Sequence, residues 1–328
     1  MLDLVTFGEA MVRLSPPNFM RLEQTPSLDL NVGGTELNVA VGASRLGLRT
    51  AWVSKLPANP LGRMIANKAR EHGVDTGHVV WETDGRAGLY FLELGATPRA
   101  SSVLYDRAES AFSHLRAGEI DWEAVLTRAT CLHLTGITPA VSASAADATL
   151  EALRAARQIG CKVSIDLNYR RKLWDPETAR RTLLPMLDSA DILITAPGDT
   201  LTVLGIETRD PDELAGVLCD RFPLEVAAVT VRQGASVWQC RWTAVARAGS
   251  TAYATRIFEI DIVDQVGRGD AFVAGFLYGY LPETDIQRGL DYGVAFAALK
   301  HSIPGDLNWS TREEVELLLQ GPPPGVSR

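Results

Sequence analysis

Apolar residues along this 328-residue chain follow two alternating patterns. Short apolar runs predict buried strands at 4–7, 50–54, 132–134, 162–166, 192–194 and 226–231. Between them, stretches with apolar residues every three or four positions predict helices at 35–46, 61–72, 142–159 and 176–187. Such alternation of strands and helices is typical of a mainly parallel sheet with helices on both faces.

Two stretches depart from this alternation. Between about 79 and 104, four punctuating residues, Gly85, Gly88, Gly95 and Pro98, separate short apolar runs and favour hairpins over a strand–helix–strand unit. Residues 236–246 predict a meander, and residues 270–280 and 285–301 predict two apolar helices. The proline-rich segment 321–328 predicts a frayed tail. Because no repeat or linker divides the chain, we expect a single domain over 1–328.

Composition narrows the class of protein. A hydrophobic fraction of 46% with 22% charged residues is typical of a globular protein with a large core. The net charge of −8 opposes binding to nucleic acid or to an anionic membrane surface. The first residues lack the basic start and long apolar run of a signal peptide, and the four cysteines are widely scattered. We therefore expect a cytoplasmic protein with neither nucleic acid nor membrane as a partner.

The strongest local motif is the segment 264–272, in which Gly267 and Gly269 precede Asp270 at the start of an apolar helix. Glycines let successive N–H groups point into one space, and the helix dipole adds positive charge there, so the segment predicts an anion hole. Asp270 could instead be a helix cap. A dinucleotide-binding fingerprint is disfavoured because Phe272 replaces its third glycine, and a P-loop is excluded because the chain has no Gly-Lys pair.

A second motif is the segment 33–38, where a glycine pair opens a helix and Asn38 follows one turn later. Bare glycine backbone lets a hydroxyl-rich ligand approach closely, and the Asn38 amide offers both a donor and an acceptor to hydroxyls. A simple turn with a helix cap explains the glycines equally well.

Together these motifs resemble the two signatures of the PfkB (ribokinase-like) carbohydrate kinase family, and the resemblance covers essentially the whole chain. Within that family the chain is most similar to 2-keto-3-deoxygluconate kinases, judged from the segments 7–9, 13–16, 166–170 and 299–306. The resemblance implies a three-layer α/β/α sandwich with a mainly parallel central sheet. It also implies a small β-sheet lid, formed by about 11–32 and 85–107, and a homodimer through that lid.

The resemblance implies a role for individual residues. Asp270 becomes the general base for the attacking sugar hydroxyl, while the backbone N–H groups of Gly267, Arg268 and Gly269 stabilise the transferring phosphoryl group of ATP. Mg²⁺ accompanies the nucleotide, and Asp199 is expected to hold it through water. The residues expected to bind sugar are Gly34, Asn38, Tyr90, Tyr105, Arg107 and Arg170. Those expected to bind nucleotide are Arg232, Gly234, Gly267 and Gly269.

The two arginines in the sugar set favour a sugar acid, since a guanidinium group can bind a carboxylate through two hydrogen bonds. Arg107 and Arg170 could instead make surface ion pairs, and Arg171 and Lys172 follow Arg170 directly. We therefore expect 2-keto-3-deoxygluconate as the substrate, with fructose, ribose or another keto sugar acid as alternatives. A nicotinamide-dependent oxidoreductase is disfavoured because the glycine motif lies near the C-terminus.

Three features depart from the family pattern, and one of them is Val237, which stands where a second glycine usually follows Gly234. Arg268 stands where a small residue is usual, and segment 196–199 replaces the usual Asn or Ser and Glu with Ala196 and Asp199. The departures at Arg268 and Ala196 leave open a sugar-binding regulatory protein that has lost phosphoryl transfer. The presence of Asp270 argues for a working kinase.

Overall fold

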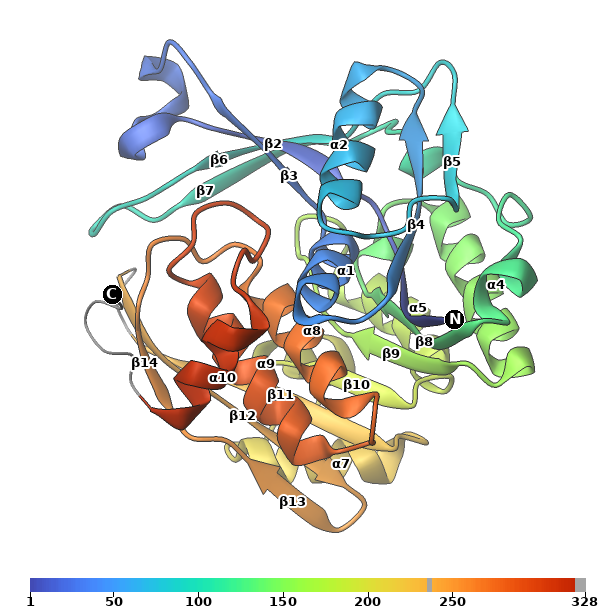
Figure 1. Ribbon diagram of the computed structural model, residues 1–328, viewed down its shortest axis with the longest axis vertical. Helices are drawn as coiled ribbons and strands as arrows, with labels where there is room; N and C mark the ends of the chain where they lie inside the picture. Colours follow the sequence, from blue (N-terminus) through green and yellow to red (C-terminus); the bar gives the residue numbers. More distant parts are fainter. Residues whose placement is uncertain (235–237, 322–328) are drawn as a thin grey trace.

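The protein is described by a computed structural model that covers residues 1–234 and 238–321 (Figure 1). A ten-stranded sheet runs through its centre in the order β13-β12-β11-β10-β9-β8-β1-β4-β5, with β14 paired to β12. All neighbours from β11 to β5 are parallel, whereas β12, β13 and β14 form an antiparallel extension. The strands are β1 (Leu2–Phe7), β4 (Thr50–Pro57), β5 (Val79–Glu82), β8 (Ala129–Thr135), β9 (Lys162–Asp166), β10 (Ile192–Thr195), β11 (Val226–Gln233), β12 (Gln239–Ala248), β13 (Thr251–Ala254) and β14 (Phe258–Asp261).

Helices cover both faces of this sheet, because successive residues of a central strand point to opposite sides. In β1, Val5 and Phe7 pack with one helical layer while Leu4 packs with the other. The first layer contains α3 (Trp122–Leu126), α4 (Ala143–Ile159), α5 (Pro176–Leu187), α6 (Pro197–Leu204) and α7 (Pro211–Arg221). The second contains α1 (Thr35–Leu46), α2 (Pro60–Glu71), α8 (Arg268–Tyr280), α9 (Ile286–Lys300) and α10 (Arg312–Gln320). The expected three-layer α/β/α sandwich is confirmed.

A separate four-stranded sheet projects from this body at the upper left of Figure 1. Its order is β3-β2-β6-β7, from β2 (Met11–Ser15), β3 (Asp29–Gly33), β6 (Leu89–Glu93) and β7 (Ser102–Asp106). These strands come from the two segments expected to form the lid, and we use that name for this sheet. β6 and β7 form an antiparallel hairpin, while β2 and β6 pair in parallel.

The hairpin prediction was wrong for the start of its region. β5 is not part of a hairpin but pairs in parallel with β4 at the edge of the main sheet. Its four residues are too few to show a periodic pattern, and the glycines that follow it favour hairpins. Sequence patterns likewise missed the short helices α3, α6, α7 and α10, and four single-turn 3₁₀ helices at Pro17–Phe19, Leu22–Gln24, Phe112–His114 and Thr138–Ala140.

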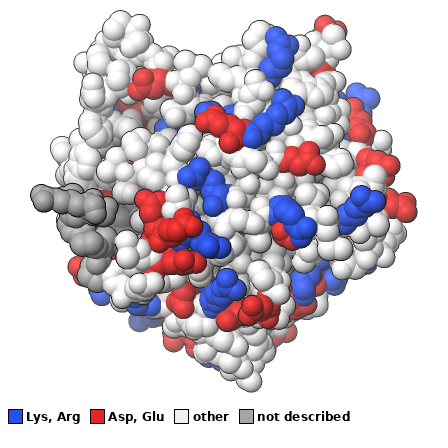
Figure 2. All heavy atoms as spheres, in the orientation of Figure 1, with Lys and Arg blue, Asp and Glu red and all other residues white. Residues whose placement is uncertain are grey.

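Other predicted elements lie close to their observed bounds. The helices at 35–46 and 176–187 and the strand at 162–166 coincide with α1, α5 and β9. The first two residues of the expected meander and most of the expected frayed tail fall in 235–237 and 322–328, outside the described residues. Within the described ranges, no helix combines the length and the apolar character needed to cross a membrane. Acidic and basic side chains are interspersed on the face shown in Figure 2.

Candidate active site

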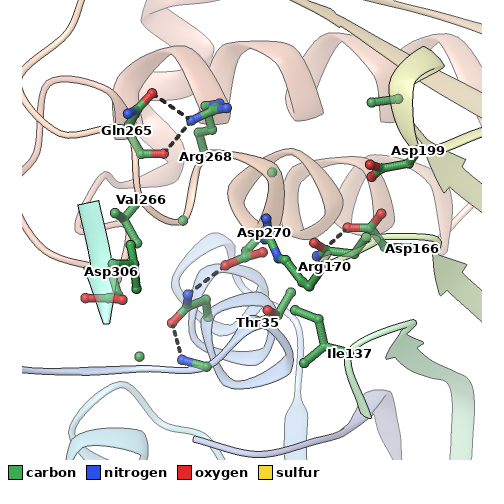
Figure 3. A pocket seen from close by; sticks show the side chains of 18 of the residues that line it. Thr35, Ile137, Asp166, Arg170, Asp199, Gln265, Val266, Arg268, Asp270 and Asp306 are labelled. Carbon is green, nitrogen blue, oxygen red and sulfur yellow. Dashed lines mark hydrogen bonds between the residues drawn. The ribbon is translucent and has the colours of Figure 1, made fainter. Parts of the chain in front are cut away.

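A cavity of about 760 Å³ opens between the lid and the carboxyl ends of β9 and β10 (Figure 3). It lies at the edge of the sheet where an open parallel α/β fold usually binds ligands. With one exception, the residues predicted for the site all line it: Gly34, Asn38, Tyr90, Tyr105, Arg107, Arg170, Asp199, Arg232, Gly267, Arg268, Gly269 and Asp270.

The exception is Gly234, so that part of the nucleotide prediction is not supported by the geometry. Gly234 directly follows the last residue of β11, Gln233, and does not line the cavity. It lines a separate hollow of about 650 Å³ together with Gln239 and Cys240.

The glycine motif near the C-terminus forms the expected turn into a helix. Gly267 has a φ of 77° and is the N-cap of α8, which begins at Arg268. A side chain at Gly267 would also come within 2.1 Å of the carbonyl oxygen of Asp306. Both the backbone angle and the close approach therefore require glycine. The N–H groups of the first helical turn have no partners within the helix, which makes this turn suitable for binding an anion.

Asp270 is not the cap of α8, because Gly267 occupies that position. Its carboxylate lies in the first turn and accepts a 2.7 Å hydrogen bond from Nδ2 of Asn38. Oδ1 of Asn38 in turn accepts the N–H of Gly34, at 3.4 Å. The two glycine motifs thus meet in space although Asn38 and Asp270 are 232 positions apart.

Burial is the main influence on the charge of Asp270, whose exposed fraction is 8%. It raises the pKa of this carboxyl to about 6, against the opposing effects of the Asn38 hydrogen bond and the positive charge of Arg170. The group is therefore mostly ionised at neutral pH but remains a stronger base than an exposed aspartate. These are properties required of a general base.

The two predicted substrate arginines differ in their environment. Arg107 is an ion-pair partner of Glu9, a buried carboxylate that also accepts a hydrogen bond from Ser110. Arg170 lines the cavity, and Figure 3 shows it near Asp166 and Asp270. Among the residues that the structure describes, no side-chain hydrogen bond or ion pair involves the Arg170 guanidinium. Arg170 is therefore the cation that is available to a ligand, whereas the charge of Arg107 is already balanced.

Two carboxylates, those of Asp166 and Asp199, lie close together near Arg170. Asp166 ends β9 and accepts a 3.1 Å hydrogen bond from Asn168, and Asp199 lies in the first turn of α6. Burial, together with the neighbouring charges of Asp199 and Asp270, raises the pKa of Asp166 well above its ordinary value. Burial also raises the pKa of Asp199. A cation placed here would relieve this repulsion, so the pair fits a magnesium site.

Such an ion would be held with few direct protein ligands. Within the described part of the chain, no group of three or more metal-binding side chains converges. Magnesium commonly keeps several waters and uses one or two carboxylates together with substrate phosphates. The geometry is therefore compatible with Asp199 acting through water and adds Asp166 beside it.

Arg268 does not occupy the anion hole with its side chain. Its guanidinium lies beside Gln265 in Figure 3 and donates a 2.9 Å hydrogen bond to the Gln265 carbonyl oxygen. Burial and the nearby charge of Arg232 lower the pKa of Arg268 to about 10, so it is still a cation at neutral pH. The unusual residue therefore leaves the helix N-terminus accessible.

Sequence reasoning missed four acidic residues of the cavity wall: Glu9, Glu36, Asp166 and Asp306. A usable signal was present, because Glu9 follows β1 closely and Asp166 is the last residue of β9. Polar residues at the carboxyl ends of parallel strands are natural candidates for a ligand site.

Comparison with known proteins agrees with this geometry. The family described as "pfkB family carbohydrate kinase" matches residues 1–311. The chain is 41% identical over 326 residues to a 2-dehydro-3-deoxygalactonokinase of Haloferax volcanii, covering 99% of each protein. It is 32% identical over 323 residues to a 2-dehydro-3-deoxygluconokinase of Thermoproteus tenax, covering 97% of this chain and 94% of that protein.

A solved structure is similar over almost the same length. The crystal structure of 2-dehydro-3-deoxygluconokinase from Thermotoga maritima superimposes with a TM-score of 0.94 at 38% identity. The match covers 98% of this chain and 100% of that one. In fold, in the meeting of its two glycine motifs and in sequence, the chain belongs to the pfkB family of carbohydrate kinases.

Proposed function

We propose that this chain transfers the γ-phosphate of ATP to a hydroxyl group of 2-keto-3-deoxygluconate or of its galactonate epimer. The observation that carries the substrate class is the guanidinium of Arg170, which makes no hydrogen bond or ion pair with the residues that the structure describes and lines the same cavity as the buried Asp270. A sugar acid supplies a carboxylate that this guanidinium can bind through two hydrogen bonds, whereas a neutral sugar supplies none. The names of the relatives, which include both epimers, support the same class.

In this proposal Asp270 accepts the proton of the attacking hydroxyl as the new oxygen–phosphorus bond forms and the bond to ADP breaks. The N–H groups of Gly267, Arg268 and Gly269 stabilise negative charge on the transferring phosphoryl group. When bound, Mg²⁺ neutralises phosphate charge, and Asp166 and Asp199 would hold it through water. Asn38 keeps the Asp270 carboxylate directed into the cavity through its 2.7 Å hydrogen bond.

A coupled assay of ADP release tests this function. The wild-type protein is offered ATP with 2-keto-3-deoxygluconate, 2-keto-3-deoxygalactonate, fructose and ribose in turn. We expect turnover with the two acids and a much lower kcat/KM with the neutral sugars. Turnover with fructose or ribose alone would contradict the proposed substrate class.

A matched pair of variants separates recognition of the carboxylate from general electrostatics. Arg170→Gln should weaken binding of the sugar acid by about 1.5–3 kcal/mol, which is the net contribution of a hydrogen bond to a charged group. Arg171→Gln removes the adjacent exposed charge, which does not line the cavity, and should leave KM unchanged. Arg107→Gln should have a smaller and less specific effect than Arg170→Gln, since Arg107 is paired with Glu9. Equal losses for acid and neutral sugars would mean that these arginines are structural.

We also infer that two copies associate through the outer face of the lid. The strand registers place four apolar residues side by side on the face opposite the cavity: Leu30, Leu14, Phe91 and Leu104. The two outermost are 58% and 60% exposed. A continuous apolar row across a small sheet is unfavourable in water, and a second copy would cover it by a self-complementary contact.

A further inference from the structure

A buried cluster of charges lies between the anion-binding loop and the lid. Arg13, on lid strand β2, is 4% exposed, and the carboxylates of Asp264 and Asp306 are each in residues 3% exposed. Both terminal nitrogens of Arg13 donate to Oδ2 of Asp264 at 3.3 Å. Its Nε lies 3.2 Å from Oδ2 of Asp306. One guanidinium therefore joins two carboxylates from different loops.

The first carboxylate fixes the backbone that leads into the anion hole. Oδ1 of Asp264 accepts the N–H of Val266 at 2.9 Å, and its Oδ2 accepts the N–H of Gly305 at 2.9 Å. Asp264 thus holds together the loop before α8 and the loop after α9.

The second carboxylate supports the glycines of both motifs. Asp306 accepts a hydrogen bond from the hydroxyl of Tyr90 on lid strand β6. Its backbone lies so close to Gly267, and its side chain so close to Gly33, that a methyl group at either glycine would come within 2.1 Å of it. A shift of Asp306 would therefore be transmitted directly to the turn that presents the anion-binding amides.

Arg13 is needed to keep this arrangement neutral. The cluster contains two carboxylates and two cations, the second being the fully buried Lys300, whose Nζ donates to the carbonyl oxygen of Ile303 at 2.8 Å. Among the described residues, Nε of Arg13 and Oδ2 of Asp306 have no hydrogen bond, so the contact between them compensates their burial. Without the Arg13 charge, two buried carboxylates would repel each other around a single lysine.

We propose that Arg13 is a positioning residue for phosphoryl transfer, which holds the anion-binding loop in its productive geometry and ties that geometry to the lid. The inference rests on the proposed kinase activity. Arginine is required because its planar group can reach both carboxylates at once, whereas a lysine offers a single compact charge. Arg13 does not line the cavity, and its side-chain contacts with Asp264 and Asp306 connect it to the anion-binding loop.

The test compares Arg13→Gln and Arg13→Lys with Lys55→Gln as a matched control. Lys55 is 6% exposed and pairs with Glu119 at 2.9 Å, but it does not line the cavity. Both Arg13 variants should lower kcat by up to about 10²-fold, the scale of a small misplacement of catalytic groups, with the smaller loss in Arg13→Lys. Sugar-acid affinity measured by calorimetry without nucleotide should change much less than kcat, because on the sugar side Arg13 acts only through the contact of Asp306 with Tyr90. Lys55→Gln should lower the melting temperature and leave kcat unchanged.

Wild-type kcat in Arg13→Gln, with a fall in melting temperature like that of Lys55→Gln, would overturn the proposal. If Arg13→Gln does not fold, Arg13→Lys decides by the same comparison. If the wild type turns over none of the sugars, the proposed substrate class fails, and MgATP affinity measured by calorimetry without sugar then tests Arg13 alone. Weaker MgATP binding in Arg13→Lys would support the positioning role, and equal binding would overturn it.

Discussion

At the scale of single residues, Asp270 combines a chemical advantage with a cost in stability. Its carboxyl group is buried, and the resulting pKa of about 6 makes it a better proton acceptor than an exposed aspartate. The same shift means that ionising Asp270 opposes folding. The folded-state pKa lies above the ordinary value of 3.8, so the stabilising contribution is present below about pH 4 and is lost as pH rises through 6.

Asp270→Asn should therefore separate activity from stability. We expect kcat to fall by roughly 10²–10⁴, the usual contribution of a positioned general base. At pH 8 the variant should also be more stable than wild type, because it buries no charge at this position. The gain in unfolding free energy should be at most about 3 kcal/mol and should appear as a higher melting temperature. That advantage should disappear near pH 4.

Two measurements check this prediction. Thermal unfolding of both proteins between pH 4 and pH 8 gives the stability difference, and initial rates over the same range give the activity. Wild-type kcat/KM should decline on the acid side of about pH 6 as Asp270 becomes protonated. Near-normal turnover in Asp270→Asn would exclude Asp270 as the base.

Arg268 is a second residue whose effect can be separated into backbone and side-chain parts. Because Arg268 contributes its N–H to the helix N-terminus whatever its side chain, Arg268→Ala should keep kcat close to wild type. The variant loses the positive charge of Arg268, which lies near Arg232, a residue expected to bind nucleotide. This loss should raise the KM for ATP. This increase should persist at high salt, since partly buried charges are screened less than exposed ones.

Steady-state kinetics with saturating sugar acid at low and high salt are the appropriate measurement. A gain of activity in Arg268→Ala over an inactive wild type would instead favour a regulatory protein in which arginine blocks transfer.

At the scale of elements, the position of α8 depends on its close contact with α9. Glycines at the contact allow the two backbones to approach, and a methyl group at Gly275 would lie 2.6 Å from the carbonyl oxygen of Tyr292. The same holds for Gly279, which would meet the carbonyl oxygen of Arg288 at 2.6 Å. Since α8 carries Asp270 at its start, this contact also sets where the proposed base stands.

Gly275→Ala should therefore destabilise the protein by about 1–3 kcal/mol through overpacking. Gly216→Ala is the control, because Gly216 lies inside α7 with open space around it. Alanine has the higher helix propensity, so this control should stabilise the protein by up to about 1 kcal/mol. Denaturant unfolding of the three proteins measures both effects, and equal stability for the two variants would contradict the account of the helix contact.

At the scale of the whole molecule, the apolar row on the lid predicts association of two copies. We expect Leu104→Asp to convert a dimer to a monomer, because it places a charge at the end of that row. Leu317→Asp changes another exposed leucine, on α10, and should leave the dimer intact. Sedimentation velocity measures the masses, and a monomeric wild type would exclude the proposed lid dimer.

Local features of the chain were sufficient to predict much of the fold and the site. Apolar spacing predicted most of the parallel strands and the longer helices, because burial on one or both faces leaves a periodic trace in the sequence. Gly267, Gly269 and Asp270 were recognisable because a tight turn and a helix start are determined over a few residues.

Other properties were decided only by tertiary structure. The hydrogen bond from Asn38, the pKa of Asp270 and the pairing of Arg107 with Glu9 all arise from residues far apart in sequence. The placement of β5 in the main sheet likewise depended on its partner strand. Backbone propensities act over a few neighbouring residues, whereas burial and charge pairing depend on which distant segments the folded sheet brings together. The sequence therefore determined the chemical groups, and the packing of the layers determined which of them act on one another.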